Sequence, residues 1–350
     1  MAALKHVNPI APHQLKLRAR THPASWLITG GAGFIGSNIT ELLLRENQRV
    51  VVLDNLSTGY AKNLDEVRAL VGPRLAENLT FIHGDIGSLD TCKKACERID
   101  YVLHQAALGS VPRSIAEPLA SHQANVNGFL NMLEAARMSE VKAFVYASSS
   151  SVYGDSAELP KVEANIGKQL SPYAGTKRIN EVYADIWTKT YGLRTIGLRY
   201  FNVFGPRQDP SGAYAAVIPK WISTLLNGQK PLVNGDGETS RDFCFVNNAV
   251  QANVLAALAE SNVDLPNIFN VSIGGRMTLN QLFTEICRVL TEQGRAPLAQ
   301  TADYGPFRKG DITHSNADIA SAMNYLGYEP THDVLSGLRD AMPWYLKHLN

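Results

Sequence analysis

The chain between residues 25 and 37 reads Ser25-Trp26-Leu27-Ile28-Thr29-Gly30-Gly31-Ala32-Gly33-Phe34-Ile35-Gly36-Ser37, a short apolar run followed by a glycine-rich turn. Gly31, Gly33 and Gly36 match the pattern GxGxxG, while Gly30, Gly33 and Gly36 match the related GxxGxxG. Glycines at these spacings permit a tight turn, a close approach of the backbone to a pyrophosphate and close packing of a following helix. The stretch therefore predicts a strand, a dinucleotide-binding turn and a helix whose N-terminus faces negative charge.

An acidic residue stands at the end of the next apolar run. Asp54 follows Gly36 by 18 residues, where a carboxylate accepts hydrogen bonds from ribose hydroxyls and repels a 2′-phosphate. This placement favours NAD over NADP. A glycine turn that serves packing alone is the competing interpretation, and the strand-helix context argues against it. Asp85, after the third run, is either a contact to adenine or an ordinary loop aspartate.

Short apolar runs alternate with longer amphipathic segments from residue 25 onward, which predicts an α/β fold with a doubly wound parallel sheet. Several runs are continuous in Val, Ile, Leu and Phe, as expected for strands that helices cover on both faces. The predicted strands are 26–29, 49–54, 79–83, 101–105, 143–147, 194–200 and 268–271. The predicted helices are 36–46, 89–97, 115–137, 172–191, 249–260 and 279–293.

The character of the chain changes after Tyr200. Prolines become frequent, Asn234-Gly235-Asp236-Gly237 predicts a β-hairpin turn, and 295–314 is expected to be irregular. We therefore predict an N-terminal extension (1–24), a dinucleotide-binding domain (25–204 plus 243–271) and a smaller lobe (205–242 plus 272–350). The extension carries basic residues and no acidic one, and a surface segment is favoured over a transit peptide.

Composition excludes several classes of protein. The 350 residues are 45% hydrophobic and 19% charged, which is typical of a globular chain. Lys plus Arg total 33 against 32 for Asp plus Glu, so no basic surface for nucleic acid or a membrane is indicated. The four cysteines lack CxxC spacing, and neither a metal site nor a disulfide framework is predicted. Without an apolar run of 18 residues or a secretory signal, we expect a cytoplasmic protein.

Four serines, residues 148–151, end the fifth predicted strand, and Tyr173 and Lys177 lie in the next predicted helix. A spacing of four places Tyr173 and Lys177 on one helix face. A Tyr with a pKa near ~10 is a poor base, and lowering that pKa by about three units takes roughly 4 kcal/mol. A Lys ammonium about 4 Å away supplies roughly this at an effective dielectric of about 20. YxxxK also occurs by chance, so its weight comes from the upstream dinucleotide turn.

From Trp26 to its C-terminus the chain resembles the extended short-chain dehydrogenase/reductase family, and within it the nucleotide-sugar 4-epimerases. The resemblance rests on the glycine turn, Ser149, Tyr173 and Lys177, and on the segments 54–59, 84–86, 104–107, 153–154 and 198–205. The chain is particularly similar to bacterial epimerases that prefer N-acetylated UDP-hexosamines, in the segments 108–114, 212–219, 235–243 and 342–345. This resemblance implies a Rossmann domain with a smaller α/β substrate-binding lobe.

The resemblance also implies roles for individual residues. Tyr173 is the base at the sugar 4-hydroxyl, Lys177 tunes it and holds the nicotinamide ribose, and Ser149 hydrogen-bonds the reacting oxygen. The residues implied to bind NAD are Gly30, Gly33, Phe34, Ile35, Gly36, Asp54, Asn55, Ser57, Thr58, Gly59, Asp85, Ile86, Gln105, Ala106, Ala107, Tyr173, Lys177, Tyr200 and Val203. Those implied to bind the UDP-sugar are Gly109, Ser110, Ser149, Ser150, Tyr173, Asn202, Gln208, Ala216, Val217, Arg241, Arg308, Asp311 and Ser315.

Reactions on this scaffold differ at the end of the fifth strand. By resemblance, sugar 4,6-dehydratases place an Asp-Glu pair there and uronic-acid decarboxylases a Glu, whereas this chain has Ser149-Ser150-Ser151. The second acid–base group that elimination needs is therefore missing. We expect a redox-neutral 4-epimerase that interconverts UDP-N-acetylglucosamine and UDP-N-acetylgalactosamine through a 4-keto sugar. Ser315 resembles the position that carries a bulky aromatic in enzymes restricted to glucose and galactose.

Alternatives stay open at this point. UDP-glucose is one alternative substrate, and UDP-N-acetylglucosaminuronate is another, because Arg113 lies near the expected sugar pocket. A sensor or scaffold that binds NAD and a UDP-sugar without turnover is the rival from another class. The resemblance further implies a homodimer formed through the helices near 115–137 and 172–191, and a place in surface-polysaccharide or O-antigen synthesis.

Overall fold

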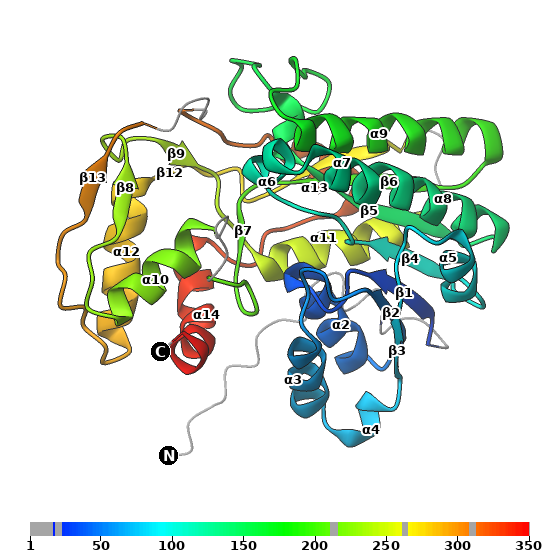
Figure 1. Cartoon of the computed structure of the whole chain (residues 1–350), viewed down its shortest axis with the longest axis horizontal. Helices are drawn as coiled ribbons and strands as arrows, with labels where there is room; N and C mark the ends of the chain where they lie inside the picture. The colour runs from blue at the N-terminus through cyan, green and yellow to red at the C-terminus, as the bar shows by residue number, and fades with distance from the viewer. Residues whose placement is uncertain (1–16, 18–22, 211–215, 261–264, 308–312, 350) are drawn as a thin grey trace.

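The computed structural model describes residues 17, 23–210, 216–260, 265–307 and 313–349. Within them, seven parallel strands form one sheet in the order β11-β6-β5-β4-β1-β2-β3 (Figure 1). All seven predicted strands are confirmed, with ends that differ by at most two residues. Their bounds are β1 Ser25–Thr29, β2 Arg49–Asp54, β3 Leu79–His83, β4 Tyr101–His104, β5 Ala143–Ser149, β6 Thr195–Tyr200 and β11 Ile268–Val271.

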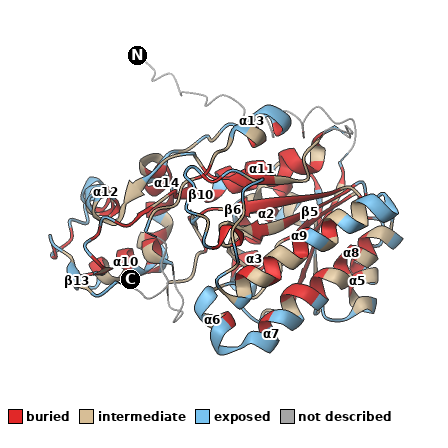
Figure 2. Ribbon diagram, turned by 90° about the horizontal axis from the view of Figure 1, so that it is seen from above, coloured by how far each residue is buried: buried red, intermediate tan, exposed pale blue. Residues whose placement is uncertain are grey.

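Helices cover both faces of this sheet, as the continuous apolar strands require. One apolar core lies between the sheet and α2 (Phe34–Arg45), α3 (Ala61–Val71) and α11 (Val246–Leu258). A second core lies on the opposite face, against α5 (Leu89–Ala95), α8 (Gly128–Met138) and α9 (Pro172–Tyr191). Figure 2 shows α11 buried along most of its length in the middle of the molecule. The predicted doubly wound α/β fold is confirmed.

The long helix predicted over 115–137 is wrong. The structure has α6 (Val111–Ala116), α7 (Pro118–His122), a π-helical turn (Gln123–Asn127) and α8 in this region. Proline has no N–H and disfavours a helical residue before it, so Pro118 starts a new helix and Glu117 leaves the helical conformation at φ −130°, ψ 63°. The helices α3 and α10 (Val217–Leu226) were not predicted from the sequence. Pro219 is tolerated in α10 because it lies in the first turn.

A smaller group of elements lies to one side of the sheet domain, on the left in Figure 1. The predicted β-hairpin at 234–237 is wrong: β8 (Leu232–Asn234) pairs in parallel with β13 (Asp303–Gly305), whereas β9 (Ser240–Arg241) pairs antiparallel with β12 (Met277–Thr278). The glycines do make a turn, with positive φ at Gly235 and Gly237, but the strands on either side take different partners. Further elements after β6 are α10, α12 (Leu279–Glu292), α13 (Ala320–Leu326), α14 (Val334–His348), and the short pair β7 (Val203–Phe204) and β10 (Cys244–Phe245).

The predicted domain boundaries stay predictions. They assign α13 to the smaller lobe, but α13 contacts β11 and α11 of the sheet domain. Short α4 (Pro73–Ala76) and the 3₁₀ turn η2 (Ser150–Tyr153) complete the described secondary structure. Across the described ranges, none of the helices has the length and apolarity needed to cross a membrane.

Candidate active site

The predicted cofactor residues gather at one edge of the sheet. Apart from Tyr173 and Lys177 of α9, they lie at or after the carboxyl ends of β1, β2, β3, β4 and β6, which parallel strands bring to the same side. The strand order reverses between β1 and β4, since β2 and β3 lie on one side of β1 and β4 lies on the other. The glycine turn after β1 therefore stands at the switch point where open α/β sheets bind ligands.

The glycine turn is packed too tightly for a side chain at Gly30 or Gly36. A Cβ added to Gly36 would lie 2.2 Å from the Gly30 carbonyl oxygen, and one added to Gly30 would lie 2.7 Å from the Ala106 nitrogen. Gly33 is the N-cap of α2, where no side chain caps the helix and no acidic residue occupies the first turn. The first N–H groups of α2 are thus left without a protein anion, which fits a bound pyrophosphate.

Asp54 connects the loop after β2 to the glycine turn. Its carboxylate accepts hydrogen bonds from the Ala32 nitrogen at 2.9 Å and from the Leu56 nitrogen at 2.8 Å. Next to it, the Asn55 amide donates to Asp85 at 2.7 Å, so the structure brings together the two aspartates that were predicted to hold adenosine. Ser57, Thr58 and Gly59 complete this loop, and a Cβ on Gly59 would meet the Ala32 carbonyl carbon at 2.9 Å.

A segment that follows β6 is hydrogen-bonded to helix α2. The buried Arg207 donates to the Ser37 hydroxyl at 3.0 Å and, through one nitrogen, to Asn38 and Glu41 at 2.8 Å each. Two residues on, Asp209 accepts from the Tyr60 hydroxyl at 2.6 Å. Residues 207–209 therefore hold α2 and the loop after β2 to the entrance of the smaller lobe, a contact that the sequence analysis did not predict.

The predicted catalytic residues meet where β5 ends. Ser149 is the last residue of β5 and hydrogen-bonds the Tyr173 hydroxyl, and Tyr173 lies in the first turn of α9. Lys177 is buried one turn further along, with its Nζ 5.9 Å from the centre of the Tyr173 ring. Above them, the Ser114 hydroxyl of α6 accepts from the Tyr173 nitrogen at 3.0 Å. The three side chains are thus brought together as the sequence analysis predicted.

Burial has the largest effect on the pKa of both Tyr173 and Lys177. Burial raises the pKa of Tyr173, while the hydrogen bond from Ser149 lowers it by less. Burial also lowers the pKa of Lys177 to about 8, against an opposing effect of Glu181. The Lys177 Nζ donates to the Ala147 carbonyl at 2.7 Å. In this structure desolvation dominates the pKa of Tyr173, while the Lys177 cation is directed at a backbone carbonyl, so the role of Lys177 in tuning the phenol stays a prediction.

Tyr200, which was predicted to border the nicotinamide, is held by two groups, one that follows β4 and one from α11. Its hydroxyl donates to Gln105 at 3.1 Å and accepts from Asn253 of α11 at 2.7 Å, and Gln105 in turn donates to Asn253 at 2.9 Å. The Ala106 nitrogen donates to the Thr29 hydroxyl at 3.3 Å. Asn253 is a site residue that sequence reasoning missed, although an Asn in an otherwise apolar helix is the signal that could have found it.

The residues predicted to bind the UDP-sugar are only partly assembled. Arg241 donates to the Thr313 carbonyl at 3.2 Å, and the Ser315 nitrogen donates to the Ser240 carbonyl at 3.2 Å, so these two predicted residues lie on neighbouring segments. Gly109 and Ser110 precede α6, Ser150 begins η2, and Ala216 and Val217 begin α10. Asn202 precedes β7, and the Gln208 amide donates to the Val203 carbonyl at 3.0 Å. Arg308 and Asp311 lie outside the described residues.

A cavity of about 200 Å³ opens beside Arg241 in the smaller group of elements. It is lined by Arg241, Phe243, Ile273, Gly275, Arg276, Met277, Glu285, Asp333, Val334 and Leu335. Ser149, Tyr173 and Lys177 do not line it, and its volume is below the roughly 300–1,000 Å³ of typical ligand pockets. We therefore do not identify it with the reacting centre. Within the described ranges, no cluster of His, Cys, Asp or Glu could hold a metal ion.

A glycine turn at the switch point, an aspartate after β2 and a Ser-Tyr-Lys set at the end of β5 define an NAD-dependent enzyme of the Rossmann type. A family model described as "NAD dependent epimerase/dehydratase family" matches residues 26–272. The chain belongs to this family, and the resemblance inferred from the sequence is confirmed.

Three relatives illustrate the similarity. A putative UDP-glucose 4-epimerase of Methanocaldococcus jannaschii is 34% identical over 91% of this chain and 97% of its own length. The solved UDP-N-acetylglucosamine 4-epimerase of Methanobrevibacter ruminantium, in complex with UDP-N-acetylmuramic acid, is 39% identical at a TM-score of 0.84, over 93% and 99%. UDP-glucuronic acid 4-epimerase of Bacillus cereus, in complex with UDP-glucuronic acid and NAD, is 27% identical at 0.80, over 92% and 99%.

Proposed function

We propose that the chain is a UDP-sugar 4-epimerase that interconverts UDP-N-acetylglucosamine and UDP-N-acetylgalactosamine with retained NAD. One observation carries the proposal: Ser149 and Tyr173 meet at the strand edge, while residues 148–154 hold no carboxylate. The nearest carboxylate of α9, on Glu181, is bound to Arg199 at 2.8 Å. No described acid group in this stretch can remove a second proton, so oxidation and reduction at one carbon is the reaction these groups support.

The residues of the chain move one proton in each direction. Bound NAD supplies a hydride acceptor, and in its reduced form the hydride donor, at C4 of the sugar. Tyr173, hydrogen-bonded to Ser149, takes the proton from O4 as the C4–H bond breaks, and it returns that proton when hydride reaches the opposite face of the 4-keto sugar. The Lys177 ammonium and the positive nicotinamide must together favour the phenolate, since burial alone raises the pKa of Tyr173.

The experiment that tests this uses the protein as purified. Denaturation should release NAD, and NMR should show conversion of UDP-N-acetylglucosamine without added cofactor. Tyr173→Phe should abolish conversion and keep the NAD. Tyr325→Phe, at an exposed tyrosine of α13, is the matched control and should leave the rate unchanged. NAD release without any epimer would instead support the sensor or scaffold.

The sugar preference rests on the surroundings of Ser315. This small, half-buried residue lies on the segment that pairs with Ser240, next to Arg241. Ser315→Tyr should therefore lower kcat/KM for UDP-N-acetylglucosamine much more than for UDP-glucose. Equal losses for both sugars would contradict an acetamido pocket at Ser315. A panel that includes UDP-glucuronate and UDP-N-acetylglucosaminuronate tests Arg113 as a carboxylate contact.

We also propose a homodimer. Val182, Ile186 and Tyr191 are exposed apolar residues of α9, and Met138 is exposed at the end of α8, which is the helix pair that the resemblance implies at the interface. Light scattering after size exclusion should give twice the 38.2 kDa of the chain, and Ile186→Glu should reduce this to one chain. Surface-polysaccharide synthesis and a cytoplasmic location stay predictions.

A further inference from the structure

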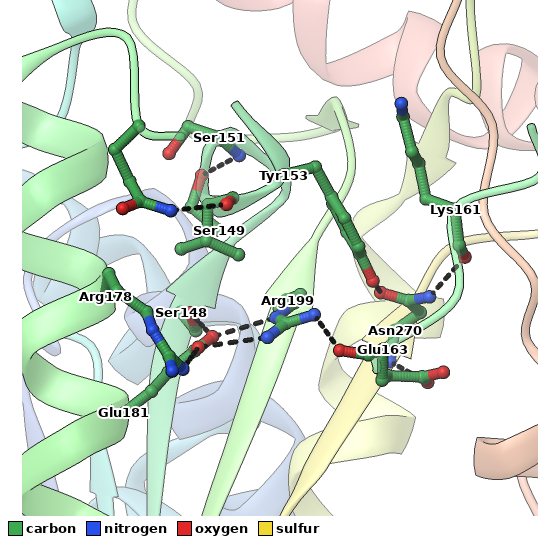
Figure 3. Close-up of polar contacts among 12 residues, drawn as sticks. Ser148, Ser149, Ser151, Tyr153, Lys161, Glu163, Arg178, Glu181, Arg199 and Asn270 are labelled. Atoms are coloured by element: carbon green, nitrogen blue, oxygen red, sulfur yellow. Dashed lines mark hydrogen bonds and ion pairs between the residues drawn. The ribbon is translucent and has the colours of Figure 1, made fainter. Parts of the chain in front are cut away.

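A buried ion pair joins α9 to β6 close to Ser149, Tyr173 and Lys177. Glu181 of α9 and Arg199 of β6 face each other with side chains that are each 2% exposed, and Figure 3 shows the pair between α9 and the sheet. The Arg199 nitrogens donate to both Glu181 oxygens, at 2.8 and 3.0 Å. The Ser148 hydroxyl donates to the first of these oxygens at 2.7 Å, and Arg178 to the second at 3.1 Å.

Three consecutive residues of β5 are each hydrogen-bonded to a side chain of α9. The Ala147 carbonyl accepts from the Lys177 Nζ at 2.7 Å. The Ser148 hydroxyl binds Glu181, and the Ser149 hydroxyl binds Tyr173. The contact made by Ser148 lies between the other two in sequence, so Glu181 fixes the part of the strand that presents both Ser149 and the carbonyl partner of Lys177.

Arg199 extends this arrangement to the loop after β5. It precedes Tyr200 in β6, and its second terminal nitrogen donates to the Glu163 carbonyl at 2.8 Å. Its guanidinium lies 4.8 Å from the centre of the Tyr153 ring. The buried pair therefore holds α9, β5, β6 and the 153–163 segment in one arrangement, on which Ser149, Tyr173, Lys177 and Tyr200 all depend.

We propose that Glu181, paired with Arg199, is a positioning residue for the reaction: it holds the Ser149 hydroxyl and the Lys177 ammonium in place against Tyr173. The proposal rests on the catalytic roles proposed above. Glu181 does not touch the reacting atoms, and it acts through Ser148 and through its place one helical turn after Lys177. A buried ion pair contributes little net stability compared with apolar residues of similar volume. Its position next to the predicted catalytic residues therefore needs another explanation.

The charge of Glu181 also changes the pKa of Lys177. Burial lowers the pKa of this lysine, and Glu181 raises it. The other ionisable groups around it offer no comparable anion: His104 of β4 is held neutral with its pKa lowered to about 3, Arg178 and Arg199 are cations, and Tyr173 is a neutral phenol whose pKa is raised. Loss of the Glu181 charge should therefore lower the pKa of Lys177 further.

The test compares a variant of Glu181 with variants of two residues that bind its carboxylate, Arg178 and Ser148. Glu181→Gln should keep bound NAD, lower kcat by about tenfold or more and leave KM within about twofold, with the alkaline limb of the kcat–pH profile moved to lower pH. Arg178→Gln removes the partner that is 40% exposed, and its kcat should stay within about twofold of wild type. Ser148→Ala keeps the ion pair and still breaks the link to β5, so it should lower kcat about fivefold even if Glu181→Gln fails to fold.

A measurement without sugar separates this inference from the proposed function. NMR of lysine-labelled holoenzyme, with the signal assigned through Lys177→Met, should show a Lys177 pKa lower by about one pH unit in Glu181→Gln. Inability of the wild type to epimerise any UDP-sugar would overturn the proposed function and the catalytic role given to Glu181. If the wild type epimerises, an unchanged Lys177 pKa or a wild-type kcat in Ser148→Ala would overturn the inference alone.

Discussion

Arg207 and Arg45 offer a comparison of two ion pairs made by one carboxylate. Arg207 is 2% exposed and binds Glu41 at 2.8 Å, while Arg45 is 47% exposed and binds the other oxygen of Glu41 at 2.9 Å. Arg207 also donates to Ser37 and Asn38. We expect Arg207→Met to lower the free energy of unfolding substantially and Arg45→Met to lower it very little.

The magnitude follows from burial. Breaking a buried pair by removing one partner costs about 3–5 kcal/mol, and the lower end applies here because Glu41 keeps 20% of its surface in water. Arg207→Met should therefore cost about 3 kcal/mol, whereas an exposed pair such as that of Arg45 contributes at most about 1 kcal/mol. Methionine keeps much of the apolar stem in place, so the difference reports the guanidinium.

Urea unfolding at saturating NAD, followed by circular dichroism, measures both variants against wild type. The reasoning about burial is refuted if the two variants lose the same free energy within about 0.5 kcal/mol. NAD content after extensive dialysis gives a second readout. Arg207→Met should retain less NAD, because residues 207–209 join α2 to the loop that carries Tyr60.

Three further outcomes are expected. Burial raises the pKa of Asp242 from 3.8 to about 6, so the folded protein binds this proton more tightly than the unfolded chain does. The shift contributes about 3 kcal/mol to the free energy of unfolding below pH 4, and this contribution is lost as the pH rises through 6. Urea titrations should show this slope in wild type and less of it in Asp242→Asn. Gly175→Ala should stabilise α9 by about 1 kcal/mol, since the new Cβ meets no atom within 4 Å, and a lowered melting temperature would contradict this. Gly36→Ala should lose bound NAD, because its Cβ would lie 2.2 Å from the Gly30 carbonyl oxygen, and NAD content like that of wild type after purification would contradict the packing argument.

Local signals in the sequence were sufficient for the sheet and for one side of the site. Continuous apolar runs predicted every strand of the sheet, and α9 starts and ends where predicted because Ser171 caps it, Pro172 is its first residue and Gly192 ends it in a left-handed conformation. The grouping of Ser149, Tyr173 and Lys177 followed from strand order and helical spacing.

Properties that depend on burial could not be predicted in the same way. The pKa of Tyr173 is raised because the fold removes it from water, which no spacing reveals. Glu181 and Arg199 are charged residues in a helix and a strand, and only the packing of α9 on β6 makes them a buried pair. The turn at Gly235 and Gly237 was recognisable, but the partners of β8 and β9 come from residues 277–305, too distant for a local pattern.

The edge strand β11 has a consequence for how the protein is made. It pairs with β6 across the interval between Tyr200 and Ile268, so a nascent chain emerging from the ribosome carries β6 with an open edge while the intervening lobe is synthesised. Open edges of this kind recruit strands from other chains. A transcript that ends before the codon for Ile268 should therefore yield aggregates or chaperone complexes, even though the whole glycine turn and the Ser149-Tyr173-Lys177 set would already be present.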